Sequence, residues 1–373
     1  MKIAELRTYV LADANKHYLY AALRTDRGIV GFGEATLDHR WPSVVAGIEE
    51  GFRTIAGQDP TAVAKHWARL KDKVYWGEGA SSMAALAAID QALWDITGKA
   101  YGLPVHKLLG GAVRDRVGVY LNQWWAGYRS TQDLIRKAQD AVSRGATALK
   151  WYPFGTADQL QYRVRQHDVP KAVAEVRAVR DAVGPSIGLM VDLWRRLDWA
   201  SAAQCCAGGA DCDLVFVEEP TEFQSADALA RLSSATRTRI AFGERLHSRR
   251  QFAEIIEKQA VGLVQPSIIR VGGLSEAIKI ANAAETYNIG VVPHNPHGPV
   301  AIAASVTLAA LVTNFVILES YENDNPPSRS QFVRQGPMIV ADSYQVPEVP
   351  GLGVEIDEMA LAGLAIATRV VHA

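Results

Sequence analysis

The sequence predicts an α/β protein in which a (β/α)8 barrel follows a smaller α+β domain. Up to the pair Gly110-Gly111, predicted strands come before predicted helices, an order that is typical of an α+β unit. Beyond that pair, eight short apolar strands alternate with helical stretches. Eight such units fit a closed barrel, because parallel neighbours need helical crossovers and eight strands close the sheet. The 373 residues, 49% of them apolar, are sufficient for a large core.

The α+β part is predicted to start with a three-stranded meander. Residues 3–9 and 19–25 alternate apolar with polar side chains, and a turn at Asp26-Arg27-Gly28 leads to a third strand over residues 30–35. The pattern then becomes helical and is strongest over residues 81–95, where two serines at the start are possible caps.

We place the α+β domain at residues 1–112 and the barrel at residues 113–342. The tail, residues 343–373, is expected to return to the α+β domain and complete it. We expect the eight barrel strands to end near or to cover Leu121, Lys150–Tyr152, Leu189–Asp192, Val215–Glu218, Ile240–Glu244, Leu263–Ser267, Val291–His294 and Val316–Glu319.

Composition and charge exclude several classes of protein. The formal net charge is −1 without a long run of like charges, so neither nucleic acid nor a membrane surface is an expected partner. The uncharged stretch 299–318 is rich in Ala and contains Ser, Thr and Asn, which favours a buried helix and a short strand over a membrane span. The N-terminus lacks an apolar signal core. A small soluble ligand remains the expected partner.

The three cysteines, Cys205, Cys206 and Cys212, lie close together in the sequence. A disulfide scaffold needs an even, spread-out set, and a zinc site needs a ligand spacing that these residues lack. We therefore expect buried or half-buried reduced thiols in a cytoplasmic protein.

Three carboxylates stand at the ends of three consecutive predicted barrel strands. Asp192, Glu218 and Glu244 end the third, fourth and fifth strands, and 26 residues separate each from the next. Barrel active sites form at this end, so the three side chains are expected at one height. Carboxylates so close together repel each other, and a hard divalent cation relieves the repulsion. All-oxygen ligation with room for water and substrate oxygens suits one Mg²⁺ per chain.

Five segments identify a family as a set, although each alone is weak. They are Met190-Val191-Asp192, Phe216-Val217-Glu218-Glu219-Pro220, Phe242-Gly243-Glu244, Val271-Gly272-Gly273-Leu274-Ser275-Glu276 and Val292-Pro293-His294. With them, nearly the whole chain resembles the enolase superfamily, in its mandelate racemase subgroup and most closely its acid-sugar dehydratases. The resemblance implies an N-terminal α+β capping domain, a modified TIM barrel, and removal of the proton α to a metal-bound substrate carboxylate. It assigns the metal ligand to Glu218, and strand alternation sends Glu219 the other way.

Lys150 and Tyr152 stand two residues apart on the second predicted barrel strand, so both face the barrel mouth. The resemblance implies a catalytic pair here, often Lys-x-Lys with the second residue as base, whereas this chain has Tyr in that place. Lys150 is expected to favour the anionic form of Tyr152 through opposite charge. Tyr152 is then either an acid or base, or only a hydrogen-bond partner of the substrate.

His294 ends the seventh predicted strand, where related enzymes carry a His base paired with an Asp at the end of the sixth. Here the sixth strand ends at Ser267, which can hold one tautomer by a hydrogen bond but adds no charge. His297 shares the role of His294 or lines the loop. Glu319 ends the eighth strand, and the resemblance implies a protonated Glu that donates to the substrate carboxylate. Burial near other carboxylates is expected to raise its pKa and keep it neutral.

Trp194 stands where sugar-acid dehydratases often have a His as general acid. Because Trp cannot donate that proton, the acid has to be His294, Tyr152 or a metal-bound water. Arg195 or Arg196 is expected to hold the far end of a polyhydroxy acid.

The sequence therefore predicts a Mg²⁺-dependent hydro-lyase of carbohydrate acid catabolism, which converts an aldonate or aldarate into a 2-keto-3-deoxy acid. The alternatives are a racemase, epimerase or cycloisomerase acting on a carboxylate, or a catalytically degenerate relative that binds metal and acid. His17 and Tyr18 lie in the first meander loop, which closes over the site in relatives, and are expected to contact the substrate. The family's barrels usually assemble, so a homo-oligomer is expected.

Overall fold

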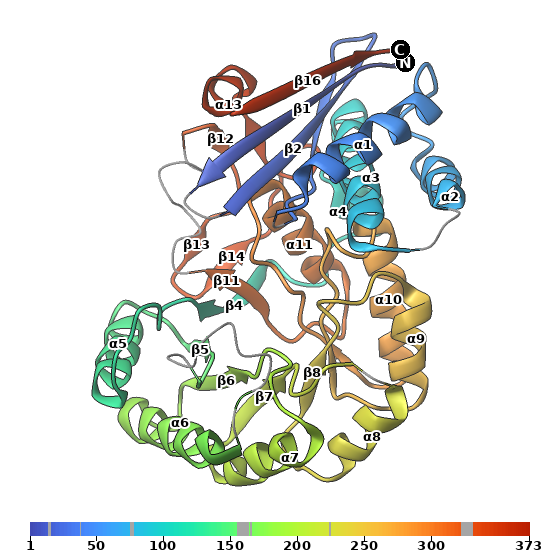
Figure 1. The fold of residues 1–373 in the computed structure, drawn as a ribbon. Helices are drawn as coiled ribbons and strands as arrows, with labels where there is room; N and C mark the ends of the chain where they lie inside the picture. Colours follow the sequence, from blue (N-terminus) through green and yellow to red (C-terminus); the bar gives the residue numbers. More distant parts are fainter. Residues whose placement is uncertain are drawn as a thin grey trace.

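The chain folds into two parts that lie one above the other, with both termini in the upper part (Figure 1). This computed structural model describes residues 1–13, 16–37, 39–74, 78–154, 164, 166–223, 225–321 and 331–373. The upper part is an antiparallel sheet packed on helices, here called the cap, and the lower part is a barrel of parallel strands. The predicted fold class, an α/β barrel with an N-terminal α+β cap, is confirmed.

The cap sheet has the order β16-β1-β2-β3, with all neighbours antiparallel. Its apolar side chains share one core with helices α1 to α3. The N-cap of α3 is Gly79 rather than a serine, but Ser82 does help to cap the helix, because its hydroxyl accepts from the Gly79 N–H at 3.2 Å. The elements are β1 (Ile3–Asp13), β2 (Lys16–Thr25), β3 (Val30–Glu34), β16 (Ala367–His372), α1 (Trp41–Ile55), α2 (Val63–Lys73) and α3 (Ala80–Tyr101).

The barrel strands follow sequence order from β4 to β10, and β11 pairs with β4. A bridge between Val291 and Phe315 links β10 to the segment before β11, which closes the sheet. β9 and β10 are short because Pro266 and Pro293 follow within two residues, and proline cannot donate a ladder hydrogen bond. The strands are β4 (Arg116–Asn122), β5 (Ala148–Trp151), β6 (Gly188–Asp192), β7 (Leu214–Glu218), β8 (Ile240–Phe242), β9 (Leu263–Val264), β10 (Gly290–Val291) and β11 (Leu318–Tyr321).

Helices alternate with the barrel strands, and each packs beside the next around the barrel (Figure 1). They are α5 (Thr131–Ser143), α6 (Val169–Val183), α7 (Trp199–Gly208), α8 (Ala226–Ser234), α9 (Arg249–Glu257), α10 (Leu274–Thr286) and α11 (Pro299–Leu311). Smaller elements are α4 (Val105–Leu108), α13 (Glu358–Leu364), the 3-10 turns Gln166–Asp168 and Ala210–Cys212, and strands β12 (Val333–Gln335), β13 (Ile339–Val340), β14 (Ser343–Gln345) and β15 (Glu355–Ile356).

The uncharged stretch 299–318 contains α11, which is buried along almost its whole length. Across the described residues, no helix combines the length and apolarity needed to cross a bilayer. The three cysteines are buried and free of disulfide bonds. In the tail, β14 pairs with β4 of the barrel and β16 pairs with β1 of the cap.

A buried carboxylate joins the cap to the barrel. Glu34, at the end of β3, accepts hydrogen bonds from the backbone N–H groups of Gly298 at 2.6 Å and Ala301 at 3.1 Å. These donors belong to the N-terminus of α11, which attracts negative charge. A Cβ on Gly298 would lie 2.3 Å from the Tyr20 hydroxyl, so the close approach of the two parts requires glycine there.

We expect Glu34→Ala to lower the free energy of unfolding by roughly 2 to 5 kcal/mol, because each buried donor left without a partner costs about 1–3 kcal/mol. Urea unfolding of the variant beside the wild type measures this loss. The control is Glu50→Ala, on the exposed face of α1, for which we expect a change within about 0.5 kcal/mol. Equal losses in the two variants would show that Glu34 does not hold the joint together.

Candidate active site

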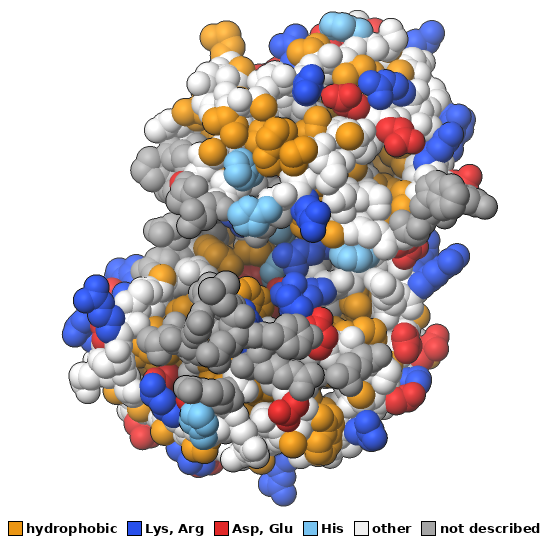
Figure 2. All heavy atoms as spheres, viewed as in Figure 1, with side chains coloured by type: hydrophobic (Ala, Val, Ile, Leu, Met, Phe, Trp, Pro, Cys, Tyr) orange, Lys and Arg blue, Asp and Glu red, His pale blue; other side chains and the backbone are white. Residues whose placement is uncertain are grey.

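A cavity of about 560 Å³ lies at the carboxyl ends of the barrel strands, beneath the cap. Figure 2 shows Lys, Arg and His side chains gathered in the hollow between the two parts. Of the residues predicted for the site, the cavity is lined by Lys150, Tyr152, Asp192, Trp194, Glu244, His294 and Glu319. The fold thus brings most of the predicted residues to one place.

The three predicted carboxylates stand at neighbouring strand ends. Asp192 and Glu218 lie opposite each other as the last residues of β6 and β7. Glu244 lies two residues beyond β8, after Gly243. Gly243 has a φ of 136°, and a Cβ there would lie 2.6 Å from the ring of Phe252, so only glycine fits.

Lys150 is a buried cation between two carboxylates. Its Nζ lies 2.5 Å from Glu218 Oε2 and 3.1 Å from Glu319 Oε1, and the residue is 1% exposed. Burial lowers the pKa of Lys150, but the two carboxylates outweigh burial and hold the pKa well above its usual value. Lys150 therefore keeps its charge and stabilises negative charge nearby.

Glu244 lies among three basic side chains. Its carboxylate lies 2.9 Å from His294 Nε2, 3.1 Å from the guanidinium of Arg245 and 3.4 Å from that of Arg270. Burial raises the pKa of Glu244, but His294, Arg270 and Arg245 outweigh it and place the pKa well below the usual value. Glu244 is therefore ionised.

Fewer positive charges offset the burial of Asp192 and Glu218 than offset the burial of Glu244. Burial, with repulsion between the carboxylates and only partial relief from Lys150, raises the pKa of Asp192 to about 7 and that of Glu218 to about 8. Glu218 Oε1 is buried and has no hydrogen-bond partner among the residues that the structure describes. As they stand, the described side chains include no group of three carboxylate, His or Cys residues arranged to hold a metal ion. However, an all-oxygen donor set with an unpaired buried oxygen fits a hard cation such as Mg²⁺.

Glu319 is held as a hydrogen-bond acceptor. Its two oxygens accept from Asn122 Nδ2 and from the backbone N–H of Asn295, both at 2.8 Å. Burial raises the pKa of Glu319, but Lys150, His294 and these hydrogen bonds outweigh it and lower the pKa. The sequence led us to expect a neutral Glu319 that donates a hydrogen bond. In the structure, hydrogen-bond donors rather than other carboxylates surround its side chain, and these donors favour the charged form.

Tyr152 lies among aromatic rings rather than beside Lys150. Its ring contacts those of Trp125, Phe154 and Trp194. Burial raises the pKa of Tyr152 to about 12, with Arg196 lowering it and Asp192 raising it. The expected stabilisation of a phenolate by Lys150 is absent, because the ammonium faces Glu218 and Glu319. At neutral pH Tyr152 carries its proton.

His294 and His297 lie side by side, with ring centroids 5.6 Å apart. His294 Nε2 contacts Glu244, and burial lowers its pKa below the usual value despite the nearby carboxylates. Ser267, expected to orient His294, instead lies 3.0 Å from His297 Nε2. His297 lies outside the main cavity and lines an adjoining one.

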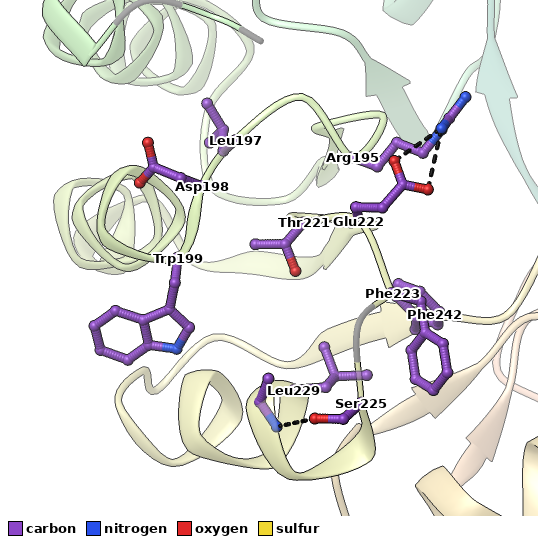
Figure 3. Close-up of a pocket in the computed structure, with 11 residues that line it drawn as sticks. Arg195, Leu197, Asp198, Trp199, Thr221, Glu222, Phe223, Ser225, Leu229 and Phe242 are labelled. Carbon is purple, nitrogen blue, oxygen red and sulfur yellow. Dashed lines mark hydrogen bonds and ion pairs between the residues drawn. The ribbon is translucent and has the colours of Figure 1, made fainter. Parts of the chain in front are cut away.

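Arg195 is placed away from the main cavity. Figure 3 shows its guanidinium beside Glu222, at 2.9 and 3.1 Å from the two carboxylate oxygens, in a separate pocket of about 100 Å³. Because that pocket is small and this pairing occupies the side chain, Arg195 is a poorer candidate for binding the far end of an acid than the sequence suggested.

His17 and Tyr18, predicted to lie in a loop, belong to the start of β2, and this segment contributes a different residue to the site. Lys16, rather than His17 or Tyr18, lines the main cavity, and its ammonium donates to the Pro296 carbonyl. His17 packs beside Trp41, with ring centroids 6.3 Å apart, and Tyr18 is buried in the core.

Sequence reasoning also missed three charged residues beside the metal-ligand candidates. Arg245 and Arg270 both line the cavity, and the position of Arg245 directly after Glu244 was an available signal. Glu219 was expected to point the other way, but it is buried with a φ of 37° and its Oε2 accepts from Arg245 Nε at 2.9 Å. The turn after β7 interrupts strand alternation and brings Glu219 to Arg245.

Comparison with known proteins gives close matches along the chain. Residues 6–110 match the family described as mandelate racemase / muconate lactonizing enzyme, N-terminal domain, and residues 133–360 match the enolase C-terminal domain-like family. A D-galactonate dehydratase of Variovorax paradoxus (strain S110) is 33% identical over 380 residues, which cover 100% of this chain and 94% of the relative.

Solved structures also match this chain over nearly its full length. A member of the enolase superfamily from Salmonella Typhimurium superposes with a TM-score of 0.93 at 26% identity, over 99% of each chain. An enolase from Agrobacterium radiobacter, bound to Na and L-malate, superposes with a TM-score of 0.88 at 30% identity, over 97% of this chain and 95% of that one.

Proposed function

Because the chain belongs to the enolase superfamily, in its mandelate racemase subgroup, we propose that it is a hydro-lyase that dehydrates a sugar acid, an aldonate or aldarate, to a 2-keto-3-deoxy acid. The dehydratase relative, aligned over the whole chain, supports this reaction class. The observation that carries the proposal is the single cavity that unites Lys150, Asp192, Glu244, His294 and Glu319.

We infer that Asp192, Glu218 and Glu244 hold Mg²⁺. When bound, the ion neutralises negative charge on the substrate carboxylate and so makes the α-proton more acidic. The unpaired Glu218 Oε1 and the raised pKa values of Asp192 and Glu218 support this ligand set. Glu244, which lies 2.9 Å from His294 Nε2, would be the third residue to hold the ion.

His294 is the best placed proton carrier, because its imidazole is buried at the wall of the cavity that Asp192 and Glu244 also line. Its Nε2 takes the α-proton, and the electron pair of the broken C–H bond forms an enediolate. The imidazolium returns that proton to the β-hydroxyl, which leaves as water when its C–O bond breaks. The resulting enol tautomerises to the 2-keto acid.

Lys150 and Tyr152 hold the reacting groups from the β5 side. The ammonium of Lys150 stabilises the negative charge that develops on the enediolate. The phenol of Tyr152, protonated at neutral pH, donates a hydrogen bond to a substrate hydroxyl. Its O–H is also a second proton source, which favours an epimerase as the runner-up function.

A product assay tests the proposed function. Purified protein with Mg²⁺ is incubated with a panel of aldonates and aldarates, and semicarbazide detects any 2-keto-3-deoxy acid. A ketone with at least one acid supports dehydration. An α-epimer without ketone would replace the proposal by the isomerase, and no exchange of the α-proton with D₂O for any acid would point to a non-catalytic relative.

We expect Mg²⁺ to stabilise the protein more strongly at about pH 8 than at about pH 6. The folded protein holds protons on Asp192 and Glu219, whose pKa values burial raises to about 7 and 8, whereas the unfolded chain has released them. The contribution of these groups to the stability of the metal-free protein therefore falls as the pH rises from about 6 to about 8. A bound cation relieves that loss.

Calorimetric unfolding with Mg²⁺ or EDTA at the two pH values measures the effect. In Asp192→Asn the Mg²⁺-dependent rise in Tm should shrink, because one ligand and one charge are gone. No rise with Mg²⁺ in the wild type, or a larger rise at the lower pH, would contradict the ligand assignment.

A further inference from the structure

A second cavity of about 360 Å³ adjoins the candidate active site. The two cavities share Lys16, Arg245, Arg270 and Pro296 as lining residues, so they meet along this wall. Beyond it, the second cavity reaches Arg40 at the start of α1 in the cap. A substrate bound at the strand ends therefore lies against residues that also line the second cavity.

Charges of both signs line the main cavity, whereas, among the described residues, the second cavity is lined by positive charges alone. In the main cavity, Asp192, Glu244 and Glu319 accompany the cations. The second cavity is lined by the cations Lys16, Arg40, Arg245 and Arg270 and by two histidines, and none of its described lining residues is a carboxylate. Like charges gathered around one space repel each other, and an anion in that space relieves the repulsion.

Arg40 is the member of this group with the clearest capacity for a ligand. Within the described part of the chain it has no carboxylate within ion-pair distance, whereas Arg245 pairs with Glu219 and Glu244 and Arg270 pairs with Glu244. A guanidinium presents paired N–H donors that match a carboxylate.

We propose that this second cavity binds the distal carboxylate of a dicarboxylic sugar acid, so that the substrate class is the aldarates rather than the aldonates. An aldonate ends in a neutral hydroxymethyl group, which needs no cluster of cations, whereas an aldarate ends in a second carboxylate. This inference rests on the proposed function, since it places the reacting carboxylate at the barrel strand ends.

Kinetics with matched acids test the inference. We expect kcat/KM for galactarate and glucarate to exceed that for galactonate and gluconate by about ten- to hundred-fold, the usual value of a charge-assisted contact. Arg40→Gln should lower the aldarate-to-aldonate ratio of kcat/KM about tenfold or more. Arg53→Gln, on the exposed side of the same helix, is the control and should leave the ratio unchanged.

Dehydration of aldonates with no advantage for aldarates would overturn this inference and leave the proposed function standing. Dehydration of neither class would count against the proposed function itself. A phosphorylated aldonate preferred over the aldarate would also overturn the inference, because the cavity would then hold a phosphate.

Binding provides a readout that is independent of turnover. Adipate and hexanoate have the same chain length and differ only in the second carboxylate, so calorimetric titration of the Mg²⁺-loaded protein isolates its contribution. We expect adipate to bind at least about tenfold more tightly, and added salt to reduce the difference. Arg40→Gln should reduce the difference as well. Equal affinities in the wild type would refute a distal carboxylate site.

Discussion

Lys150→Met is expected to lower the free energy of unfolding of the metal-free protein by about 3–5 kcal/mol, the usual cost of removing one partner from a buried ion pair. The variant leaves Glu218 and Glu319 buried without the ammonium that lies between them. Turnover should fall by about 10²–10³-fold, because the enediolate loses a preorganised cation. Urea unfolding and the semicarbazide assay measure the two effects.

Lys258→Met is the matched control for this prediction. Lys258 also contacts a carboxylate, Asp227 at 2.6 Å, but both side chains are exposed, so we expect a much smaller loss of stability. Mg²⁺ should restore part of the stability of Lys150→Met by neutralising Glu218, without restoring turnover. A loss as small as that of Lys258→Met would show that the buried network does not depend on Lys150.

His294→Asn is expected to reduce both dehydration and exchange of the substrate α-proton by about 10²–10⁴-fold, the usual contribution of a general acid–base residue. Tyr152→Phe should retain exchange, because the phenol keeps its proton at neutral pH and contributes only a hydrogen bond. Exchange is followed by NMR in D₂O with Mg²⁺ present.

His297→Asn is the neighbouring control. Its ring contacts Ser267 and lies outside the main cavity, so exchange should change far less than in His294→Asn. The opposite pattern, with exchange lost in Tyr152→Phe and kept in His294→Asn, would transfer the role of base to Tyr152.

The sequence predicts the fold and the strand-end carboxylates well, because both depend on local periodicity. A residue at the end of a parallel strand reaches the barrel mouth whatever the rest of the chain does. Asp192 and Glu218 illustrate this, since the β6–β7 register places them opposite each other. Predicting their position required only the strand ends.

The protonation states could not be predicted in the same way, because they depend on partners that are distant in sequence. Glu319 is ionised through Asn122, Asn295 and Lys150, and no local pattern joins these residues. Likewise, Lys150 faces Glu218 instead of Tyr152, because the packing of side chains across the barrel sets its direction. The cations Arg40 and Lys16 reach the site only through the docking of the cap.

The pairing of β16 with β1 has a consequence for synthesis of the chain. β1 ends at Asp13 and its outer partner begins at Ala367, so about 350 residues separate them. At a ribosomal rate of about 5–20 residues per second, the outer edge of β1 remains unpaired for roughly 20 to 70 s until that partner is synthesised. During this interval the nascent cap presents an open strand edge, the kind of surface that recruits foreign strands or chaperones.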